Sequence, residues 1–321
     1  MSARLFPLLL FVAGAAQAQA ADERTLRAGD SELRVEVVEV ADRERAAMLQ
    51  RWIAETATAP LTVFGRFPLR TAQVRVKQVS SDDDSPVPWG QTLRSGGVSV
   101  LLFVRENATL DELRADWTAV HELSHLFHPY LGSSGRWMAE GLASYYQNVL
   151  RARVGLLDGD DAWRRLDGGF QRGRKATRGV RLDELQIRRG GTMRVYWAGA
   201  AFWLEADLAL RERGDSLDAV LAEYSRCCLG DGTEQVEPEA FAAALDKIAK
   251  RPVFAPLYRR YAASEDFPSL DTAYRRLGIR TIDGELRFSR GDAGERLREA
   301  IAGKREVRGP QVSSANRSGE P

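Results

Sequence analysis

Residues 109–146 read TLDELRADWTAVHELSHLFHPYLGSSGRWMAEGLASYY, and this stretch decides the fold prediction. The only histidines of the 321-residue chain lie within eight residues of it: His121, His125 and His128. The first two are four residues apart, so on a helix both imidazoles point to the same side. Such a pair can bind one cation at the ~2.0–2.1 Å of a zinc–nitrogen bond. We therefore expect a metal site here.

The segment His121-Glu122-Leu123-Ser124-His125, H-E-x-x-H, is expected on a helix. A capping box at Thr109–Glu112 predicts that this helix begins at Thr109 and runs to about Phe127. Glu122 lies at the rim of the histidine face. There it can take a proton from an attacking water instead of binding the metal. A third ligand is still needed.

Glu140 is the best candidate for the third ligand, since the second expected helix, Trp137 to Arg153, carries it. Positions 126 to 139 separate it from His125, which is enough for a turn and a reversal of direction. Two His and one Glu leave a fourth position open, as in catalytic zinc sites. The other interpretation is a carboxylate on a solvated helix face, but the segment is apolar and an unpaired carboxylate is costly there.

HELSH followed by WMAEGLASYY resembles the gluzincin metallopeptidases, whose second motif commonly reads W-L-x-E-G-x-A-x-Y. It is similar to the aminopeptidase N and glycyl aminopeptidase families and to smaller peptidases with the same thermolysin-like catalytic domain. The stretch VYWAGA at 195–200 resembles their Y-x-x-G segment. The resemblance covers roughly residues 96–279. It implies hydrolysis of peptide bonds and a Zn²⁺ cofactor.

The resemblance also implies a role for each site residue. His121, His125 and Glu140 would bind zinc, Glu122 would act as general base, and Tyr196 would steady the oxyanion by donating a hydrogen bond. The alternative for Tyr196 is a core position in an aromatic helix. His128 is open to three interpretations: a helix cap, a residue behind the ligands or in the pocket, or a further ligand.

One departure from the family pattern bears on the substrate. Aminopeptidases of this type carry G-x-M-E-N on the strand before the zinc helix, and their Glu holds the free amino group. The corresponding stretch here is GGVSV at 96–100, with Ser99 in place of that Glu. A neutral serine cannot pair with an ammonium. We therefore favour an endopeptidase. Alternatives are an aminopeptidase with another amine anchor, and an envelope binding or assembly factor that kept zinc but lost turnover.

The hydrophobic pattern predicts an α+β fold with a sheet-bearing first half and a mainly helical second half. The resemblance implies that this fold is a thermolysin-like zincin, with a small N-terminal sheet lobe and a mainly helical C-terminal lobe. Strands are expected at 31–40, 71–79 and 98–104, a helix at 41–55, and a polar loop at 80–97. Further helices are expected at 195–213, 217–227, 238–250, 253–263 and 270–277, with a hairpin about Asp283-Gly284. The catalytic domain would span 21–265 (lobes 31–128 and 135–265), followed by an extension, 266–321, with a disordered tail from 309.

The first twenty residues, MSARLFPLLLFVAGAAQAQA, have one cation, a short apolar run and an Ala-x-Ala ending. This order predicts a signal peptide cleaved near Ala20 and a periplasmic or secreted bacterial protein. No later segment is apolar enough for membrane insertion. With 46 basic and 45 acidic residues the net charge is +1, which suggests no nucleic-acid partner. The expected partner is a peptide or protein substrate, and the oligomeric state stays open.

Two other features have less direct interpretations. Cys227 and Cys228 are adjacent, so a disulfide between them would be far from ordinary geometry, and we expect two core-facing thiols. A redox site or an intermolecular link are the alternatives. The polar stretch 158–190 is either a lid or simple surface. Its basic cluster, 172–175, is expected in a solvated loop.

Overall fold

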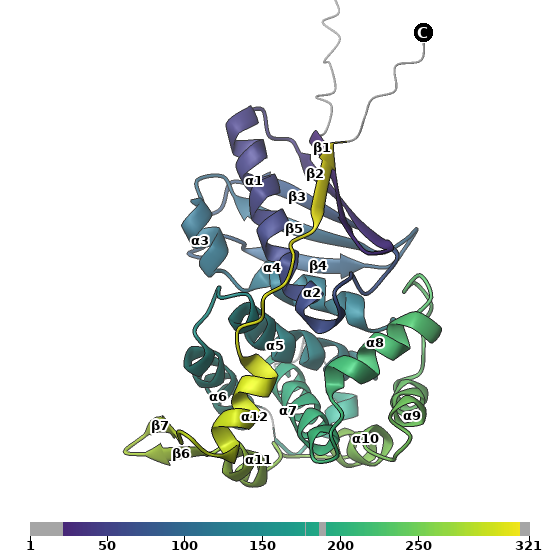
Figure 1. The fold of residues 1–321 in the computed structure, drawn as a ribbon, viewed down its shortest axis with the longest axis vertical. Helices are drawn as coiled ribbons and strands as arrows, with labels where there is room; N and C mark the ends of the chain where they lie inside the picture. Colours follow the sequence, from purple (N-terminus) through teal and green to yellow (C-terminus); the bar gives the residue numbers. More distant parts are fainter. Residues whose placement is uncertain (1–21, 177, 186–190, 315–321) are drawn as a thin grey trace, which may run out of the picture.

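The computed structural model describes residues 22–176, 178–185 and 191–314, so the predicted signal peptide lies outside the described residues. A mixed sheet and the helices beside it form one end of the molecule, and a group of helices forms the other (Figure 1). The strands are β1 (Asp22–Ala28), β2 (Ser31–Val38), β3 (Thr71–Val79), β4 (Trp89–Leu93), β5 (Ser99–Arg105), β6 (Ile279–Ile282), β7 (Glu285–Phe288) and β8 (Gln311–Ser314).

The main sheet has the order β4-β5-β3-β2-β1-β8. Strands β2, β3 and β5 run parallel, and the outer pairs β4–β5, β1–β2 and β1–β8 are antiparallel. The register aligns the buried side chains across the strands; for example, Val35 lies opposite Val74, and Val74 opposite Val100. This alignment gives the sheet one apolar face, which helices cover.

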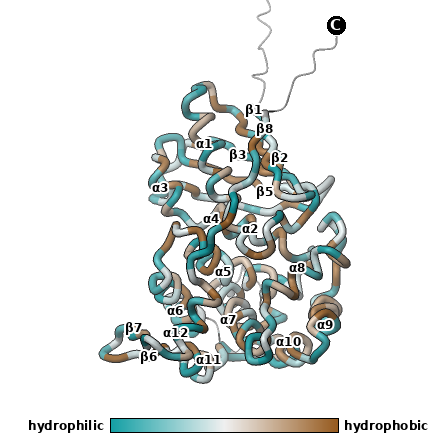
Figure 2. The backbone as a smooth tube through the Cα atoms, viewed as in Figure 1, coloured by the Kyte–Doolittle hydropathy of each residue, from teal (hydrophilic) through white to brown (hydrophobic). Residues whose placement is uncertain are grey.

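The α-helices of the described residues are α1 (Arg43–Thr56), α2 (Thr58–Phe64), α3 (Leu110–Ala115), α4 (Thr118–Ser124), α5 (Arg136–Arg153), α6 (Gly159–Lys175), α7 (Thr192–Arg211), α8 (Leu217–Cys227), α9 (Pro238–Ala249), α10 (Phe254–Ala262), α11 (Asp271–Arg276) and α12 (Ala293–Ala302). Two single turns of 3₁₀ helix, η1 (His125–Phe127) and η2 (Leu182–Glu184), complete the set. Hydrophobic residues recur along the strands and the interior helices (Figure 2). None of these helices has the length and apolar character that a membrane span requires.

Helix α5 is the centre of the helical part. Every residue of α5 except Arg136 and Ala139 is buried, and α4, α6, α7 and α12 pack around it. Its closest neighbour is α7, because Gly141 faces Gly199. A Cβ added at Gly199 would lie 1.9 Å from the carbonyl oxygen of Trp137. Only glycine permits this approach of the two backbones.

The single helix expected over 109–127 is wrong, because the chain breaks between α3 and α4. The capping box at Thr109 is present and begins α3. Asp116 then adopts an extended conformation, and its carboxylate accepts the backbone N–H of Thr118 at 2.7 Å, which begins a new helix. Helix α4 ends at Ser124 and continues as η1. The break lets the histidine-bearing helix take its own direction beneath the sheet.

Cys227 and Cys228 do not match the expectation of core-facing thiols. They form a disulfide with each other, and both are exposed at the end of α8. The expectation was wrong because the last turn of α8 points these side chains to solvent, so they do not contribute to the core.

Two further predictions about polar segments need correction. Residues 311–314 of the expected disordered tail form β8, which pairs with β1, whereas 315–321 lie outside the described residues. The stretch 158–190 contains α6, whose apolar side packs on α5 and α7, so the basic cluster 172–175 is helical and not a loop. The sequence analysis did not predict this helix because its buried apolar residues are interspersed with many polar residues and glycines. The predicted α+β fold itself is confirmed.

Candidate metal centre

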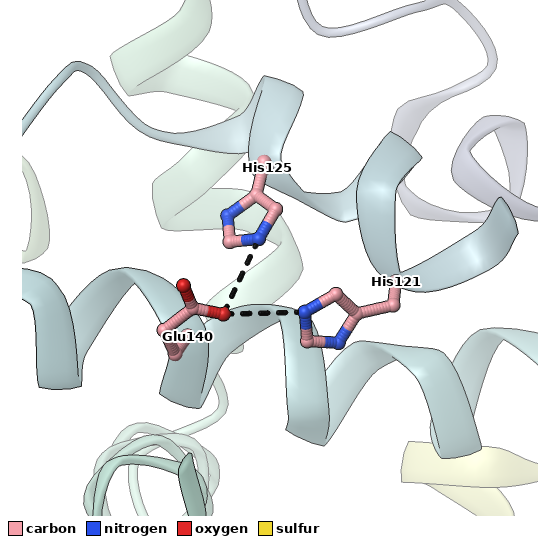
Figure 3. A group of neighbouring side chains, drawn as sticks. All are labelled: His121, His125 and Glu140. Atoms are coloured by element: carbon pink, nitrogen blue, oxygen red, sulfur yellow. Dashed lines mark hydrogen bonds and ion pairs between the residues drawn. The ribbon is translucent and has the colours of Figure 1, made fainter. Parts of the chain in front are cut away.

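Three side chains from three elements point toward one another (Figure 3). His121 comes from α4, His125 from the 3₁₀ turn that follows it, and Glu140 from the start of α5. The Oε2 of Glu140 lies 3.3 Å from Nε2 of His121 and 3.6 Å from Nε2 of His125. The three ligand atoms all lie within 4.8 Å of one another, and this group could hold a metal ion. The structure thus brings together the three residues that the sequence predicts as metal ligands, and their role as ligands stays a prediction.

Hydrogen bonds on the far side of the rings assign the protons of the histidines. Nδ1 of His121 lies 2.8 Å from Oε1 of Gln147, an atom that only accepts, so Nδ1 carries the proton. Nδ1 of His128 likewise donates to the carbonyl of Pro129, at 2.6 Å. Burial lowers the pKa of His128 well below its usual value, so this ring is neutral. Its Nε2 therefore accepts from Nδ1 of His125, at 2.9 Å.

Both Nε2 atoms face Oε2 of Glu140, and without a metal a proton on Nε2 of His121 can donate to that oxygen. Two lone pairs and a carboxylate oxygen repel one another unless positive charge lies between them. Without a metal, a proton on the histidine supplies that positive charge, and the pKa of His121 shows the effect. Burial lowers the pKa of His121, but its hydrogen bond to Glu140 and the charges of Glu122 and Glu140 raise it above the usual value overall. Two nitrogens and one carboxylate oxygen form the donor set that zinc prefers.

Glu122 lies beside this group and is held by β4. Thr92 donates from its hydroxyl to Oε2 of Glu122, at 3.0 Å. Gly90 lies so close that an added Cβ would be 2.8 Å from Cγ of Glu122, so the strand can approach only with glycine here. The carboxylate is 6% exposed and is not one of the three converging ligands. It is thus placed to exchange a proton beside the metal position.

Tyr196 extends from α7 over the same group. Its ring stacks on that of His121, with centroids 5.7 Å apart and planes 7° apart. Burial and the charge of Glu140 raise the pKa of this phenol far above its usual value. The phenol is therefore a hydrogen-bond donor at any physiological pH. Its partly exposed position fits a site residue better than the alternative of a core aromatic.

Sequence reasoning missed several residues that support the site. Thr92 and Gln147 hold Glu122 and His121, and Arg94 donates from Nη2 to the carbonyls of His125 and His128, at 2.6 and 3.0 Å. Gln147 could have been found, since it lies two helical turns after Glu140 on the same face. Thr92 and Arg94 had no local signal, because they lie some thirty residues before the histidines.

The strand that lies against the site is not the one expected. Ser99, expected on the strand next to the zinc helix, lies on β5, one position in from the edge of the sheet. The edge strand β4, which packs on α4, comes from the segment expected to be a loop. Its residues, WGQTL, include no acid. The strand beside Glu122 therefore carries no carboxylate for an amine.

No protein-family model matches the sequence, and no curated protein matches it. Solved structures do match its fold. An aminopeptidase N family protein from Idiomarina loihiensis has a TM-score of 0.58 at 14% identity, over 81% of this chain and 49% of that one. Yeast LTA4 hydrolase in complex with bestatin has a TM-score of 0.52 at 12% identity, over 77% and 41%. Legionella pneumophila aminopeptidase A in complex with aspartic acid gives 0.52 at 14%, over 77% and 28%.

This chain spans about half, or less, of the length of the structures that it matches. At these identities the likeness concerns the fold. The converging group of His121, His125 and Glu140 is an observation on this chain itself. The resemblance inferred from the sequence is therefore confirmed: the chain has a fold similar to that of the aminopeptidase N family of zinc metallopeptidases, and within it three side chains that could bind zinc.

Proposed function

We propose that this protein is a zinc-dependent peptidase that hydrolyses peptide bonds by general-base attack of water. The observation that carries the proposal is the convergence of two histidine Nε2 atoms and one carboxylate beside a second, separate carboxylate. His121, His125 and Glu140 would hold the metal, and Glu122 would remain free for chemistry. A purely structural zinc site has no use for the fourth group.

The bound zinc would polarise the scissile carbonyl and offset the negative charge that develops on its oxygen. Glu122 takes a proton from the attacking water and then passes it to the leaving amine. The hydroxyl of Thr92 keeps the Glu122 carboxylate in one orientation, so the base does not have to be ordered during the reaction. Tyr196 donates a hydrogen bond from its phenolic hydroxyl to the developing oxyanion.

Strand β4 supports binding of an extended peptide. Within the described residues it pairs only with β5, so its other edge keeps free backbone donors and acceptors beside the site. A peptide can add to this edge by main-chain hydrogen bonds. Because β4 carries no acidic side chain, nothing on it selects a free amino terminus. We propose an endopeptidase. An aminopeptidase with another amine anchor is the second candidate, because the structures of similar fold include an aminopeptidase N family protein and an aminopeptidase A.

The central experiment compares the mature, zinc-loaded protein with its Glu122→Gln variant on casein and on fluorogenic peptides. We expect kcat to fall by about 10²–10⁴-fold, the contribution of a positioned general base, with zinc content unchanged. Glu44→Gln, at an exposed position on α1, is the matched control and should retain full activity. Equal cleavage by the wild type and Glu122→Gln would overturn the assignment.

Tyr196→Phe tests the oxyanion donor separately. Removing the one hydroxyl should lower kcat by roughly 10²–10³-fold while KM and zinc content change little, because the donor acts on the transition state. Steady-state kinetics with elemental analysis of the same sample provide the measurement. An unchanged kcat would contradict the proposed oxyanion role and indicate that Tyr196 only packs against its neighbours.

Peptides with free and acetylated amino termini separate the two peptidase candidates. An endopeptidase should cleave both members of a pair at comparable rates, whereas an aminopeptidase should reject the blocked one. Zinc-loaded protein that cleaves neither would favour the third hypothesis, a binding or assembly factor of the cell envelope without turnover.

We also propose that the protein acts in the periplasm or outside the cell. The support is the order of residues 1–20, which matches a secretory signal. N-terminal sequencing of the protein recovered from periplasmic and culture fractions should show a first residue at or near Ala21. A full-length chain found only in the cytoplasm would contradict this proposal.

A further inference from the structure

Helices α5, α6 and α7 pack together (Figure 1). A pocket rich in arginine lies among them and shares two lining residues with the metal centre. Its volume is about 560 Å³. We call it the arginine pocket and define it by Arg151 from α5, Arg164, Arg165 and Arg172 from α6, and the two residues that it shares with the metal centre, Gln147 and Tyr196. Nothing in the proposed catalytic steps uses these four arginines.

The lining of the arginine pocket has an excess of positive charge. Its one acid is Asp161, which already pairs with Arg164 at 2.8 Å. Arg172 lies over the ring of Trp197, 5.1 Å from its centroid, and has no ion pair within the described residues. Arg165 has neither a hydrogen bond nor an ion pair in the described part of the chain, and its charge acts on Arg151. Three of the four cations therefore form no ion pair in the described part of the chain. The charge of Asp116 also acts on Arg151, but Asp116 does not line the pocket.

Arg151 is the unusual member of the set, because it lies beneath the pocket and is only 1% exposed. Its Nη2 donates to the carbonyl of Ala115, at 2.7 Å, while Nε and Nη1 are buried without an acceptor. Burial lowers the pKa of Arg151 to about 10, so the group is still charged at neutral pH. A buried cation with two unused donors is costly unless an anion approaches it. The hydroxyl of Ser144, in the same lining, is also buried without a partner.

The position of the pocket ties any bound anion to the reaction site. Gln147 holds His121 from behind, and Tyr196 stacks on the same ring. Both side chains line the arginine pocket. A peptide whose scissile bond lies at the metal centre can therefore reach the pocket with a neighbouring group.

We propose that the arginine pocket binds a carboxylate of the peptide substrate and thereby makes the protein selective for anionic peptides. The carboxylate belongs either to an acidic side chain near the scissile bond or to the carboxyl terminus of a short peptide. Guanidinium groups suit it because they bind both oxygens of a carboxylate with parallel hydrogen bonds. This inference rests on the proposed peptidase function, and it adds the class of substrate.

The test uses the full zinc-loaded protein and peptides in matched pairs. One pair exchanges Glu for Gln next to the scissile bond, and the other exchanges a terminal carboxylate for an amide. The wild type should prefer the anionic member of at least one pair by about tenfold or more in kcat/KM, and the pair that responds identifies the source of the carboxylate. High salt should reduce this preference.

Two rim variants and a control connect the preference to the pocket. Arg165→Gln and Arg172→Gln should each reduce the ratio of anionic to neutral kcat/KM by several-fold to tenfold. Lys175→Gln removes a cation from an exposed position of the same helix that does not line the pocket, so the ratio should not change. Equal treatment of both members of both pairs by the wild type would overturn the proposal, as would a ratio that falls as much in Lys175→Gln.

Calorimetric binding of the same peptides to the Glu122→Gln variant separates this inference from the function beneath it. Preferential binding of the anionic peptides, together with no cleavage by the wild type, would contradict the peptidase function but support the carboxylate site. Cleavage of all the peptides without any preference would support the peptidase function but contradict the carboxylate site. The two failures are thus distinguishable.

Discussion

His128 shows how a single side chain determines what its neighbour can do. Its Nε2 accepts a hydrogen bond from Nδ1 of His125, and its Nδ1 donates one to the carbonyl of Pro129. The ring of His125 is thereby held in the tautomer whose Nε2 faces Glu140. Of the three interpretations that the sequence left open, the structure supports a residue behind the ligand, neither a further ligand nor a plain cap.

We predict that His128→Leu weakens zinc binding by roughly 10–100-fold, the usual cost of losing a partner behind a metal ligand. The leucine fills the buried space but leaves Nδ1 of His125 without an acceptor. Competition with a chromophoric chelator measures the affinity, and thermal unfolding of the metal-free proteins shows whether the fold is intact. An unchanged zinc affinity in a folded variant would contradict the role assigned to His128.

At the residue scale, the proximity of the three proposed ligands was predictable from the spacing of the histidines and the length of the turn before Glu140. His121 and His125 share a face by spacing, and Glu140 follows after a turn of suitable length. Thr92 was not predictable, since its contact with Glu122 depends on which strand lies at the sheet edge. That is a property of the tertiary fold, which no local pattern records.

At the scale of elements, the contact between α5 and α7 positions both halves of the site. Gly141 directly follows Glu140, and Gly199 lies one turn after Tyr196. The two glycines face each other where the helices meet. The distance between Glu140, the proposed ligand, and Tyr196, the proposed oxyanion donor, is therefore set by two residues without side chains.

Gly199→Ala should disturb both stability and activity. The new Cβ would lie 1.9 Å from the Trp137 carbonyl oxygen, so the helices must separate, at a cost of about 1–3 kcal/mol or more. Denaturant unfolding measures this cost, and zinc affinity and kcat should fall with it. Gly168→Ala on α6 is the control, because its Cβ would meet only the end of Arg172, at 3.6 Å. There the helix should gain roughly 0.5–1 kcal/mol. A Gly199→Ala protein as stable as the wild type would show that the helices are not so tightly apposed.

The elements themselves were predicted unevenly, for physical reasons. Strand β3 and helix α8 have the predicted limits because their patterns are strong and their ends are marked. Helix α6 was missed because arginine and glycine hide its apolar stripe, and the break at Asp116 was missed because it depends on a side chain capping the next helix. Strand β4 was missed because its residues show no alternation of buried and exposed side chains. It contributes to the sheet through its backbone.

At the scale of the whole molecule, one buried carboxylate links three distant segments. Asp218 on α8 pairs with Arg153 at the end of α5, at 2.9 Å, and with Arg305 from the C-terminal segment, at 3.0 Å. Tyr146 donates a further hydrogen bond, at 3.0 Å. Burial alone would raise the pKa of Asp218, but the two arginines hold it below its usual 3.8. Ionised Asp218 thus stabilises the folded protein.

Asp218→Asn should destabilise the protein by about 3–5 kcal/mol at neutral pH, because Arg153 then stays buried without its counter-charge. The lowered pKa determines the sign of the pH effect. The stabilisation by Asp218 is complete above pH 3.8 and is lost as the pH falls through the still lower folded value. The stability difference between wild type and variant, measured by denaturant unfolding, should therefore shrink in strong acid. A constant difference down to pH 2 would contradict this account.

Strand β8 has a consequence for how the chain matures. Residues 311–314 cover the edge of β1, which begins at residue 22, so the segments that close this side of the sheet lie almost three hundred residues apart in order of synthesis. A nascent chain must keep the outer edge of β1 unpaired until its last described strand has been made, and an unpaired edge is open to other strands. A denatured full-length chain has both segments from the start. Production inside the cell therefore exposes this protein to mispairing for longer than refolding in the test tube does.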